Sequence, residues 1–152
     1  MDAAVLYPAP TPCPAFVMAP VLTKSTVIRH VRDPEAALRL FNALVASPNE
    51  MVAFAYLDPE RRLLGMRHTQ AGRVDAADVP VRLVVTDALA FDAAMVVMAH
   101  THPGGDPAPS EADRAVTRRL ARALRSVEVR LVDHLVLVPG GGASSFRAIG
   151  LL

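Results

Sequence analysis

The sequence predicts a single α/β domain with a mixed β-sheet, and three observations carry this prediction. The chain has 152 residues, of which 52% are hydrophobic and 20% charged, as expected for one domain with a buried core. Runs of strand-type residues alternate along the chain with helical patterns, which is typical of α/β domains. No apolar run reaches the roughly 18 residues of a membrane-spanning helix.

Charge and cysteine content narrow the class of protein. The formal net charge of +1 gives no support to nucleic-acid binding driven by overall charge. Cys13 is the one cysteine of the sequence, which excludes an intramolecular disulfide and a cysteine-rich zinc site. The sequence does not start with a basic segment followed by an apolar one, as a secretory signal would. We therefore expect a cytoplasmic protein without membrane contact.

The first elements are a proline-rich arm and a helix. Five of the thirteen prolines lie within residues 1–20, and proline stiffens an extended chain. We expect residues 1–24 to form a Pro-rich N-terminal arm and residues 25–152 to form the domain. A helix is predicted to begin at Asp33, because Asp favours the N-cap and Pro34 the first helical position. Its apolar spacing continues to Val45, and Ser47-Pro48 ends it.

A β-hairpin, a helix and a buried strand are predicted next. The apolar run Met51–Leu57 suits a strand, residues 58–61 suit a turn, and residues 62–69 suit the returning strand. Gly72 marks a loop. Residues 86–94 are predicted as a helix, residues 81–85 fit either a strand or a helix, and residues 95–99 are predicted as a short buried strand.

The last third of the chain is predicted to hold a loop, a long helix and short strands. Residues 100–109 contain three prolines and two glycines, which predicts a loop. A helix is expected from Ser110 to about Ser126, with Ser110 as N-cap and Asp113 completing a capping box. Residues 128–131 and 134–138 are predicted as two strands, residues 140–142 as a glycine turn, and residues 144–147 as an edge strand.

The chemistry is concentrated in residues 100–113. His100 and His102 stand one residue apart at a strand end, so both imidazoles project to one face and can reach a single ion. Asp113 lies in the first turn of the following helix, where its carboxylate can point back. Two histidines and one carboxylate leave a fourth position for water, the pattern of a catalytic zinc. The alternative is an ordinary His-x-His pair beside a helix cap.

The whole string is His-x-His, seven residues, Ser, two residues, Asp, and it resembles the JAMM motif of JAB/MPN metalloprotease-like domains. Residues 100–110 are similar to the RadC-like branch, as are Leu131-Val132-Asp133-His134 and residues 145–152. The resemblance covers about residues 33–152. It implies a single-domain JAB/MPN-like (cytidine-deaminase-like) fold, in which a mixed sheet flanked by helices makes three layers.

The resemblance also implies a function. It predicts a zinc-dependent JAMM-type metallo-hydrolase with one Zn2+ per chain, which cleaves a peptide or isopeptide amide of a polypeptide substrate with metal-activated water. His100, His102 and Asp113 would hold the zinc. Glu50, just ahead of the apolar strand, matches the family's catalytic glutamate, and Ser110 matches its donor to the oxyanion. Without the resemblance, Glu50 is more simply a solvated residue at a loop–strand junction.

Some features depart from the RadC-like pattern. Thr101 and Gly104 stand where many RadC-like chains have Asn and Ser. The helix-hairpin-helix region of full-length RadC proteins is not seen in this sequence, which weakens a link to DNA.

Two other functions stay open at the level of sequence. The first is a catalytically silent JAMM-fold interaction module, linked to DNA-repair or mobile-element functions as the RadC name suggests. The second is nucleic-acid binding through a stripe of arginines on one helix face, whose simpler interpretation is a solvated surface: Arg114, Arg118, Arg122 and Arg125. His134 stands amid apolar residues and is predicted to be a core histidine. The oligomeric state is left open, a homodimer included.

Overall fold

The computed structural model describes residues 29–70 and 79–152. The predicted arm over residues 1–24, Cys13 and the loop at Gly72 lie outside the described residues.

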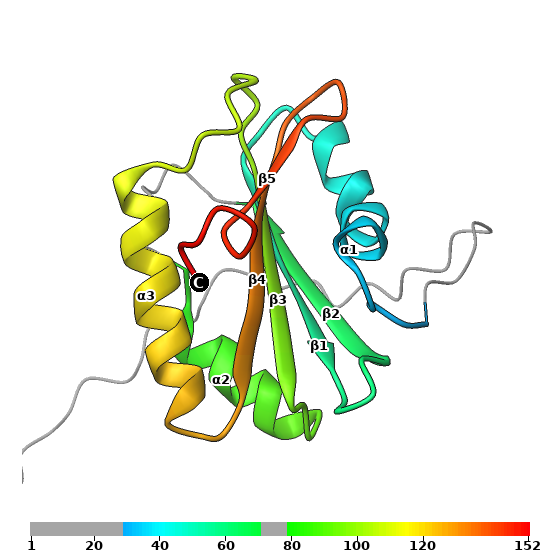
Figure 1. Ribbon diagram of the computed structural model, residues 1–152, viewed down its shortest axis with the longest axis vertical. Coiled ribbons are helices and arrows are strands. Elements are labelled where there is room, and N and C mark those ends of the chain that lie inside the picture. Colours follow the sequence, from blue (N-terminus) through cyan, green and yellow to red (C-terminus); the bar gives the residue numbers. More distant parts are fainter. Residues whose placement is uncertain (1–28, 71–78) are drawn as a thin grey trace, which may run out of the picture.

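A five-stranded mixed sheet in the order β2-β1-β3-β4-β5 forms the middle of the molecule (Figure 1). β1 pairs antiparallel with β2 and with β3, β3 pairs parallel with β4, and β4 pairs antiparallel with β5. The parallel pair is joined through α3, as a parallel pair requires a crossover. The strands are β1 (Met51–Leu57), β2 (Leu63–Gln70), β3 (Met95–Thr101), β4 (Arg130–Leu137) and β5 (Ala143–Ser145).

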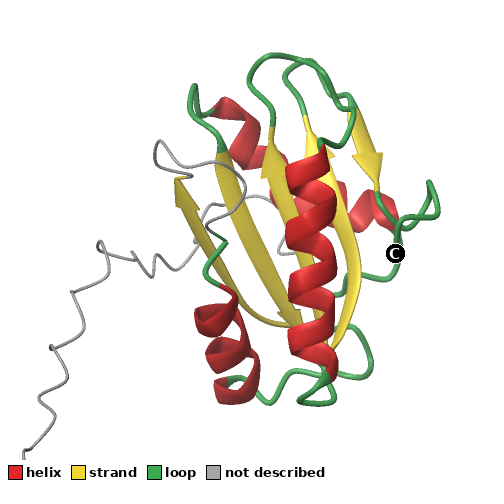
Figure 2. Ribbon diagram, turned by 90° about the vertical axis from the view of Figure 1, so that its left-hand side faces the viewer, coloured by secondary structure: helices red, strands yellow, loops and turns green. Residues whose placement is uncertain are grey.

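Helices cover both faces of this sheet. One face carries α1 (Pro34–Phe41), which continues as the 3-10 helix η1 (Asn42–Ala46). The other face carries α2 (Val81–Ala90) and α3 (Glu111–Arg125), which lie in front of the sheet in Figure 2. The predicted α/β class with a mixed sheet between helical layers is therefore confirmed. Within the described part of the chain, no helix has the length and apolarity to cross a membrane.

Successive side chains of the central strands point to opposite faces of the sheet, and this produces two hydrophobic cores. Phe54 and Met98 pack under α2 and α3, whereas Ala53 and Val97 pack under α1 with Phe41. Every residue of β1 and β3 is buried, because helices cover both faces. This explains why the two strands appear in the sequence as continuous apolar runs.

Several predicted elements are confirmed. Asp33 caps α1 by accepting a 2.7 Å hydrogen bond from the Ala36 amide. The hairpin of β1 and β2 forms as expected, and Ser110 caps α3 with a complete capping box. These elements depend on neighbours in sequence, which is why local patterns predict them.

Other predictions are wrong in their bounds. The segment 81–85, which the sequence left open between strand and helix, belongs to α2. This helix ends at Ala90 rather than at residue 94, since Asp92 has a positive φ of 51°. β3 continues through His100 and Thr101, so the loop begins later than expected. The helix predicted to run to residue 45 becomes 3-10 after Phe41, and the edge strand is Ala143–Ser145 instead of residues 144–147.

The two strands predicted over residues 128–131 and 134–138 are one strand, β4, with a β-bulge. Val96 of β3 faces Leu131, whereas its neighbour Val97 faces Asp133, so Val132 is the extra residue. A bulge of this kind re-aims the side chains that follow it. Here it leaves Val132 and Asp133 both beside the same hollow under α1, and His134 faces α3, where it contacts Thr117.

A buried polar network ties α2 to the first hairpin. The carboxylate of Asp87 on α2 accepts a 3.0 Å hydrogen bond from the Tyr56 hydroxyl and a 2.7 Å bond from Nη2 of Arg67. Burial, followed by the charge of Asp87, raises the pKa of Tyr56 and keeps the phenol protonated. We call Tyr56, Arg67 and Asp87 the Asp87 network.

Candidate metal centre

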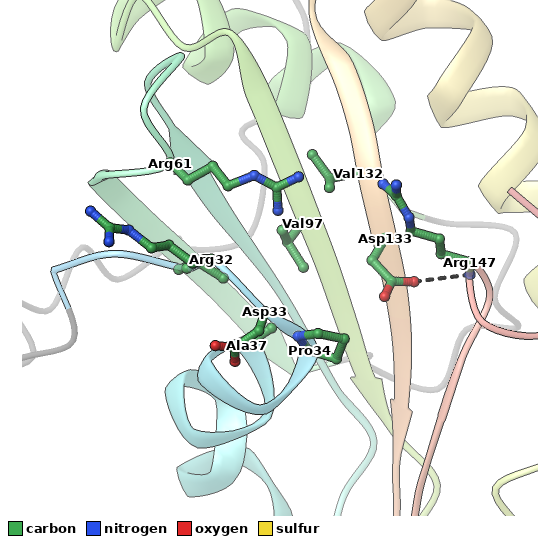
Figure 3. Close-up of a pocket in the computed structure, with 10 residues that line it drawn as sticks. Arg32, Asp33, Pro34, Ala37, Arg61, Val97, Val132, Asp133 and Arg147 are labelled. Atoms are coloured by element: carbon green, nitrogen blue, oxygen red, sulfur yellow. Dashed lines mark hydrogen bonds between the residues drawn. The ribbon is translucent and has the colours of Figure 1, made fainter.

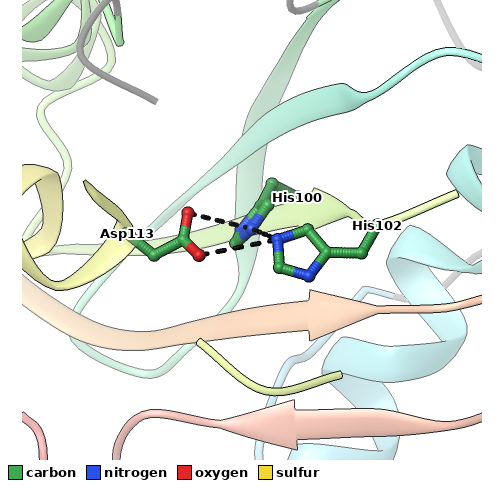
Figure 4. Close-up of side chains that lie close together, drawn as sticks. All are labelled: His100, His102 and Asp113. Atoms are coloured by element: carbon green, nitrogen blue, oxygen red, sulfur yellow. Dashed lines mark hydrogen bonds and ion pairs between the residues drawn. The ribbon is translucent and has the colours of Figure 1, made fainter. Parts of the chain in front are cut away.

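Three side chains that could hold a metal converge at the end of β3 (Figure 4). His100 is the penultimate residue of β3 and lies on the α3 side of the sheet. His102 follows the strand, and its amide donates to the Leu137 carbonyl at 2.8 Å. Asp113 lies in the first turn of α3 and points back toward both imidazoles. The prediction that these three residues come together is therefore met by the fold.

The two imidazoles face different oxygens of the Asp113 carboxylate, at separations close to those between ligand atoms of a zinc site. Nε2 of His100 lies 3.2 Å from Oδ1 of Asp113, and Nε2 of His102 lies 3.5 Å from Oδ2. A tetrahedral zinc with bonds of about 2.0–2.1 Å holds its ligand atoms about 3.3–3.4 Å apart. The two Nε2 atoms are 2.8 Å apart, so the imidazoles need to separate by about 0.5 Å to reach that geometry. The residues present therefore fit a zinc ion.

The three candidate metal ligands differ in how far they are buried. The side chains of His100 and Asp113 are 7% and 4% exposed, whereas that of His102 is 19% exposed. The centre is therefore closed on the side of the core and more open at His102. A closed protein side with one accessible side is what a catalytic metal needs to admit substrate.

Asp113 is held in its ionised form. Burial by itself raises its pKa, but hydrogen bonding and charge attraction from His100, together with hydrogen bonds from Ser110, outweigh burial and lower the pKa well below its usual range. Both the amide and the hydroxyl of Ser110 donate to Oδ2 of Asp113 at 2.7 Å. The Asp113 amide donates in return to Oγ of Ser110 at 3.1 Å. Asp113 thus belongs to the helix cap and to the ligand group at once.

His134 touches this centre, a contact that the sequence did not reveal. It is fully buried, as predicted, but its Nε2 lies 2.7 Å from Nδ1 of His100 and its Nδ1 lies 2.6 Å from Oγ1 of Thr117. Burial first, and the nearby charge of His100 next, lower the pKa of His134 well below its ordinary value. Phe146 stacks on its ring at a centroid distance of 4.4 Å. Its place within the segment Leu131-Val132-Asp133-His134, which resembles the RadC-like pattern, is the signal in the sequence that could mark it.

Glu50 lies at the same end of the sheet but outside the group of three. It is exposed and immediately precedes β1. Val52, two residues on, pairs in register with His100, and the Met51 amide donates to Oγ1 of Thr101 at 2.9 Å. The antiparallel pairing of β1 with β3 therefore brings Glu50 beside the strand end that carries the histidines.

The predicted arginine stripe lies along α3. Arg118, Arg122 and Arg125 are exposed. Arg114 is partly buried and pairs with Glu111 at 2.8 Å. The stripe is a solvent-facing surface of the helix, separate from the buried ligand group.

A hollow of about 230 Å³ lies on the other face of the sheet, beside the start of α1 (Figure 3). Val97 and Val132 form part of its lining, together with three arginines: Arg32, Arg61 and Arg147. The Asp133 carboxylate at its edge accepts from the Ser145 hydroxyl at 2.6 Å and from the Arg147 amide at 3.1 Å. This carboxylate therefore fastens the chain end to β4, and the hollow is not part of the metal centre.

Comparisons with known proteins give this architecture a family. The family model described as RadC-like JAB domain matches residues 31–151. A UPF0758 protein of Xanthomonas campestris is 44% identical over 109 residues, 71% of this chain and 48% of that protein. A UPF0758 protein of Vibrio cholerae is 43% identical over 109 residues, 72% of this chain and 68% of that protein. The chain spans about half the length of the first curated relatives it matches, and their names state no activity.

Proposed function

Because this chain belongs to the RadC-like JAB domain family, we propose that it is a zinc-dependent hydrolase of peptide or isopeptide amide bonds. The observation that carries the proposal is the convergence of His100, His102 and Asp113, whose ligand atoms all lie within 4.8 Å of one another. Two imidazoles and a carboxylate are the donor set of catalytic zinc sites with one open position. A zinc ion held there supplies a Lewis acid that polarises a carbonyl and lowers the pKa of water.

Glu50 is the proposed general base and acid. Its carboxylate is exposed at the sheet end that carries the ligands, where it can accept a proton from the attacking water. The same carboxylate then delivers that proton to the leaving amine nitrogen. An exposed position suits this role, since the group must reach both water and a polypeptide substrate.

Ser110 is the proposed donor to the oxyanion, and its surroundings set a condition on that role. Its one hydroxyl proton is donated to Oδ2 of Asp113. The hydroxyl therefore has to leave this acceptor before it can stabilise negative charge on the substrate. The amide of Ser110 also donates to Asp113, so the helix cap survives that rotation.

The experiment combines zinc content with hydrolysis of a quenched fluorogenic peptide library that includes Lys ε-amide linkages. We expect about one zinc per chain, lost in Asp113→Ala, and hydrolysis that disappears in Glu50→Gln while zinc stays bound. Glu60→Gln is the matched control, since Glu60 is also an exposed carboxylate, located in the hairpin turn. Equal hydrolysis by Glu50→Gln and Glu60→Gln would exclude the assigned role of Glu50.

Two observations favour a second candidate, a metal-holding interaction module without catalysis. The Ser110 hydroxyl is committed to the helix cap, and Glu50 stands apart from the ligand group. The module would be supported if the wild-type chain binds zinc but cleaves no peptide of the library, and if the Glu50→Gln variant still binds the same partner as the wild type. The exposed arginines of α3 are its proposed contact with an acidic partner or with phosphates.

A further inference from the structure

We propose that His134 is a positioning residue that fixes His100 in the tautomer presenting Nε2 to the metal. The inference rests on the metal-binding part of the proposed function and not on hydrolysis. It follows from assigning each proton along four buried groups that touch one another: the Asp113 carbonyl, Thr117, His134 and His100.

The assignment starts at a carbonyl, which can only accept. Oγ1 of Thr117 lies 2.5 Å from the backbone oxygen of Asp113, so the hydroxyl proton must lie between them. Having donated that proton, Thr117 can only accept from His134, whose Nδ1 is 2.6 Å away. His134 therefore carries its proton on Nδ1.

Burial decides the state of the second nitrogen of His134. The residue is fully buried, and its ring is stacked on Phe146. A charged imidazolium without a carboxylate partner is costly in such a place, so His134 is neutral and its Nε2 has no proton. Nε2 then accepts from Nδ1 of His100 at 2.7 Å. The neutral form of His100, which is the form that binds a metal, is therefore left with a bare Nε2, and this is the atom that faces Asp113 and His102.

His102 reaches the same state by a shorter route. Its Nδ1 lies 2.8 Å from the backbone oxygen of Asp106, which can only accept, so Nδ1 carries the proton and Nε2 is bare. Two lone pairs and one carboxylate thus converge in a largely buried space. A metal ion, or a proton shared between His100 and Asp113, stabilises such an arrangement, and outer hydrogen bonds of this kind orient metal-ligating histidines.

The first test is the tautomer of His134, read from long-range 1H–15N NMR of the 15N-labelled chain at pH 8, without zinc and with zinc. We expect a protonated Nδ1 and a bare Nε2 in both samples, because Thr117 imposes this form whether or not zinc binds. His30 and His68 are internal references, because they lie outside this chain of hydrogen bonds, which we call the His134 relay. A proton on Nε2 of His134 would overturn the proposal, even if the chain binds zinc. Failure to bind zinc with the expected tautomer would instead count against the proposed function.

The second test is zinc affinity in matched variants. His134→Gln keeps an acceptor toward His100, whereas His134→Met has the same length and offers only a weak one. We expect His134→Met to raise the zinc Kd about 10–100-fold, and His134→Gln to recover most of the affinity. Thr117→Ser and Thr117→Val form a second pair in case a His134 variant does not fold, with affinity lost only in Thr117→Val. Wild-type affinity in His134→Met or in Thr117→Val would refute the relay.

Discussion

Asp113 carries two functions that a pair of substitutions can separate. Asp113→Ala removes the metal ligand and the acceptor of the helix cap together. Asp113→Asn removes the charged ligand but keeps an oxygen where Oδ2 stands, since two donors from Ser110 point at that position. The amide nitrogen then takes the place of Oδ1, 3.2 Å from Nε2 of His100, where it can donate to the bare imidazole nitrogen.

The expected magnitudes follow from these contacts. Without metal, Asp113→Ala leaves two donors of Ser110 without their acceptor, a loss of about 1–3 kcal/mol in the free energy of unfolding. Asp113→Asn keeps both bonds, so its stability should stay within about 1 kcal/mol of wild type. Zinc at 100 times its Kd adds about 2.7 kcal/mol to the wild type, and a variant with a 100-fold higher Kd retains only about 0.4 kcal/mol of this gain.

Urea unfolding at pH 8, with EDTA and with zinc, measures both effects. The wild type and Asp113→Asn should unfold together in EDTA and separate in zinc. Asp106→Asn is the control, because among the described residues the Asp106 carboxylate accepts from the Ala108 amide in the loop and is not part of the ligand group, so this variant should keep the zinc gain. The reasoning fails if Asp113→Asn gains as much from zinc as the wild type, or if it is as unstable in EDTA as Asp113→Ala.

Two predictions concern the frame around the site. Asp87→Ala should cost about 1–3 kcal/mol in urea unfolding, because it removes the acceptor of the buried Tyr56 hydroxyl, while Glu35→Ala at an exposed pair should stay within about 0.5 kcal/mol. Gly65→Ala should cost about 1–3 kcal/mol, because a Cβ there would lie 2.6 Å from the Phe91 ring, whereas Gly104→Ala meets nothing within 4 Å and should be neutral or slightly stabilising. A Gly65→Ala chain as stable as the wild type in thermal unfolding would contradict this packing.

The parts of the fold that follow local rules could be predicted from the sequence. Asp33-Pro34 and Ser110 with Asp113 are caps whose partners lie within three residues, so their patterns are complete in a short window. The His-x-His pair is local in the same sense. Its alternation at a strand end places both imidazoles on one side before any tertiary contact is known.

The bulge in β4 could not be predicted, because it exists only relative to β3. Val132 is an extra residue against the register of its neighbour strand, and a break in alternation looks the same in sequence as the end of a strand. The role of His134 was hidden for the same reason. Its partners His100 and Thr117 are 34 and 17 residues away, and only the pairing of β3 with β4 and the packing of α3 bring them together.

Glu50 is a different case, because it was identified by resemblance to the family and not by its local sequence pattern. Resemblance alone singled it out among the acidic residues, since nothing in its local pattern separates it from Glu35 or Glu60. The fold adds a physical reason, namely the register that sets Val52 against His100. That reason concerns the backbone, so it supports a place near the metal centre and leaves the role of the carboxylate to the Glu50→Gln experiment.

Asp113 belongs both to the cap of α3 and to the metal centre, and this has a consequence for metal affinity. Ser110 and Asp113 bond to each other in the capping box of α3, and the same contacts hold the carboxylate toward the histidines. The carbonyl of Asp113 also anchors Thr117, from which the tautomer of His134 follows. The first turn of α3 therefore positions the ligand Asp113 and, through Thr117 and His134, fixes the tautomer of the ligand His100. Metal affinity should thus depend on the integrity of this turn, and substitutions there should weaken zinc binding even where they leave all three ligands in place.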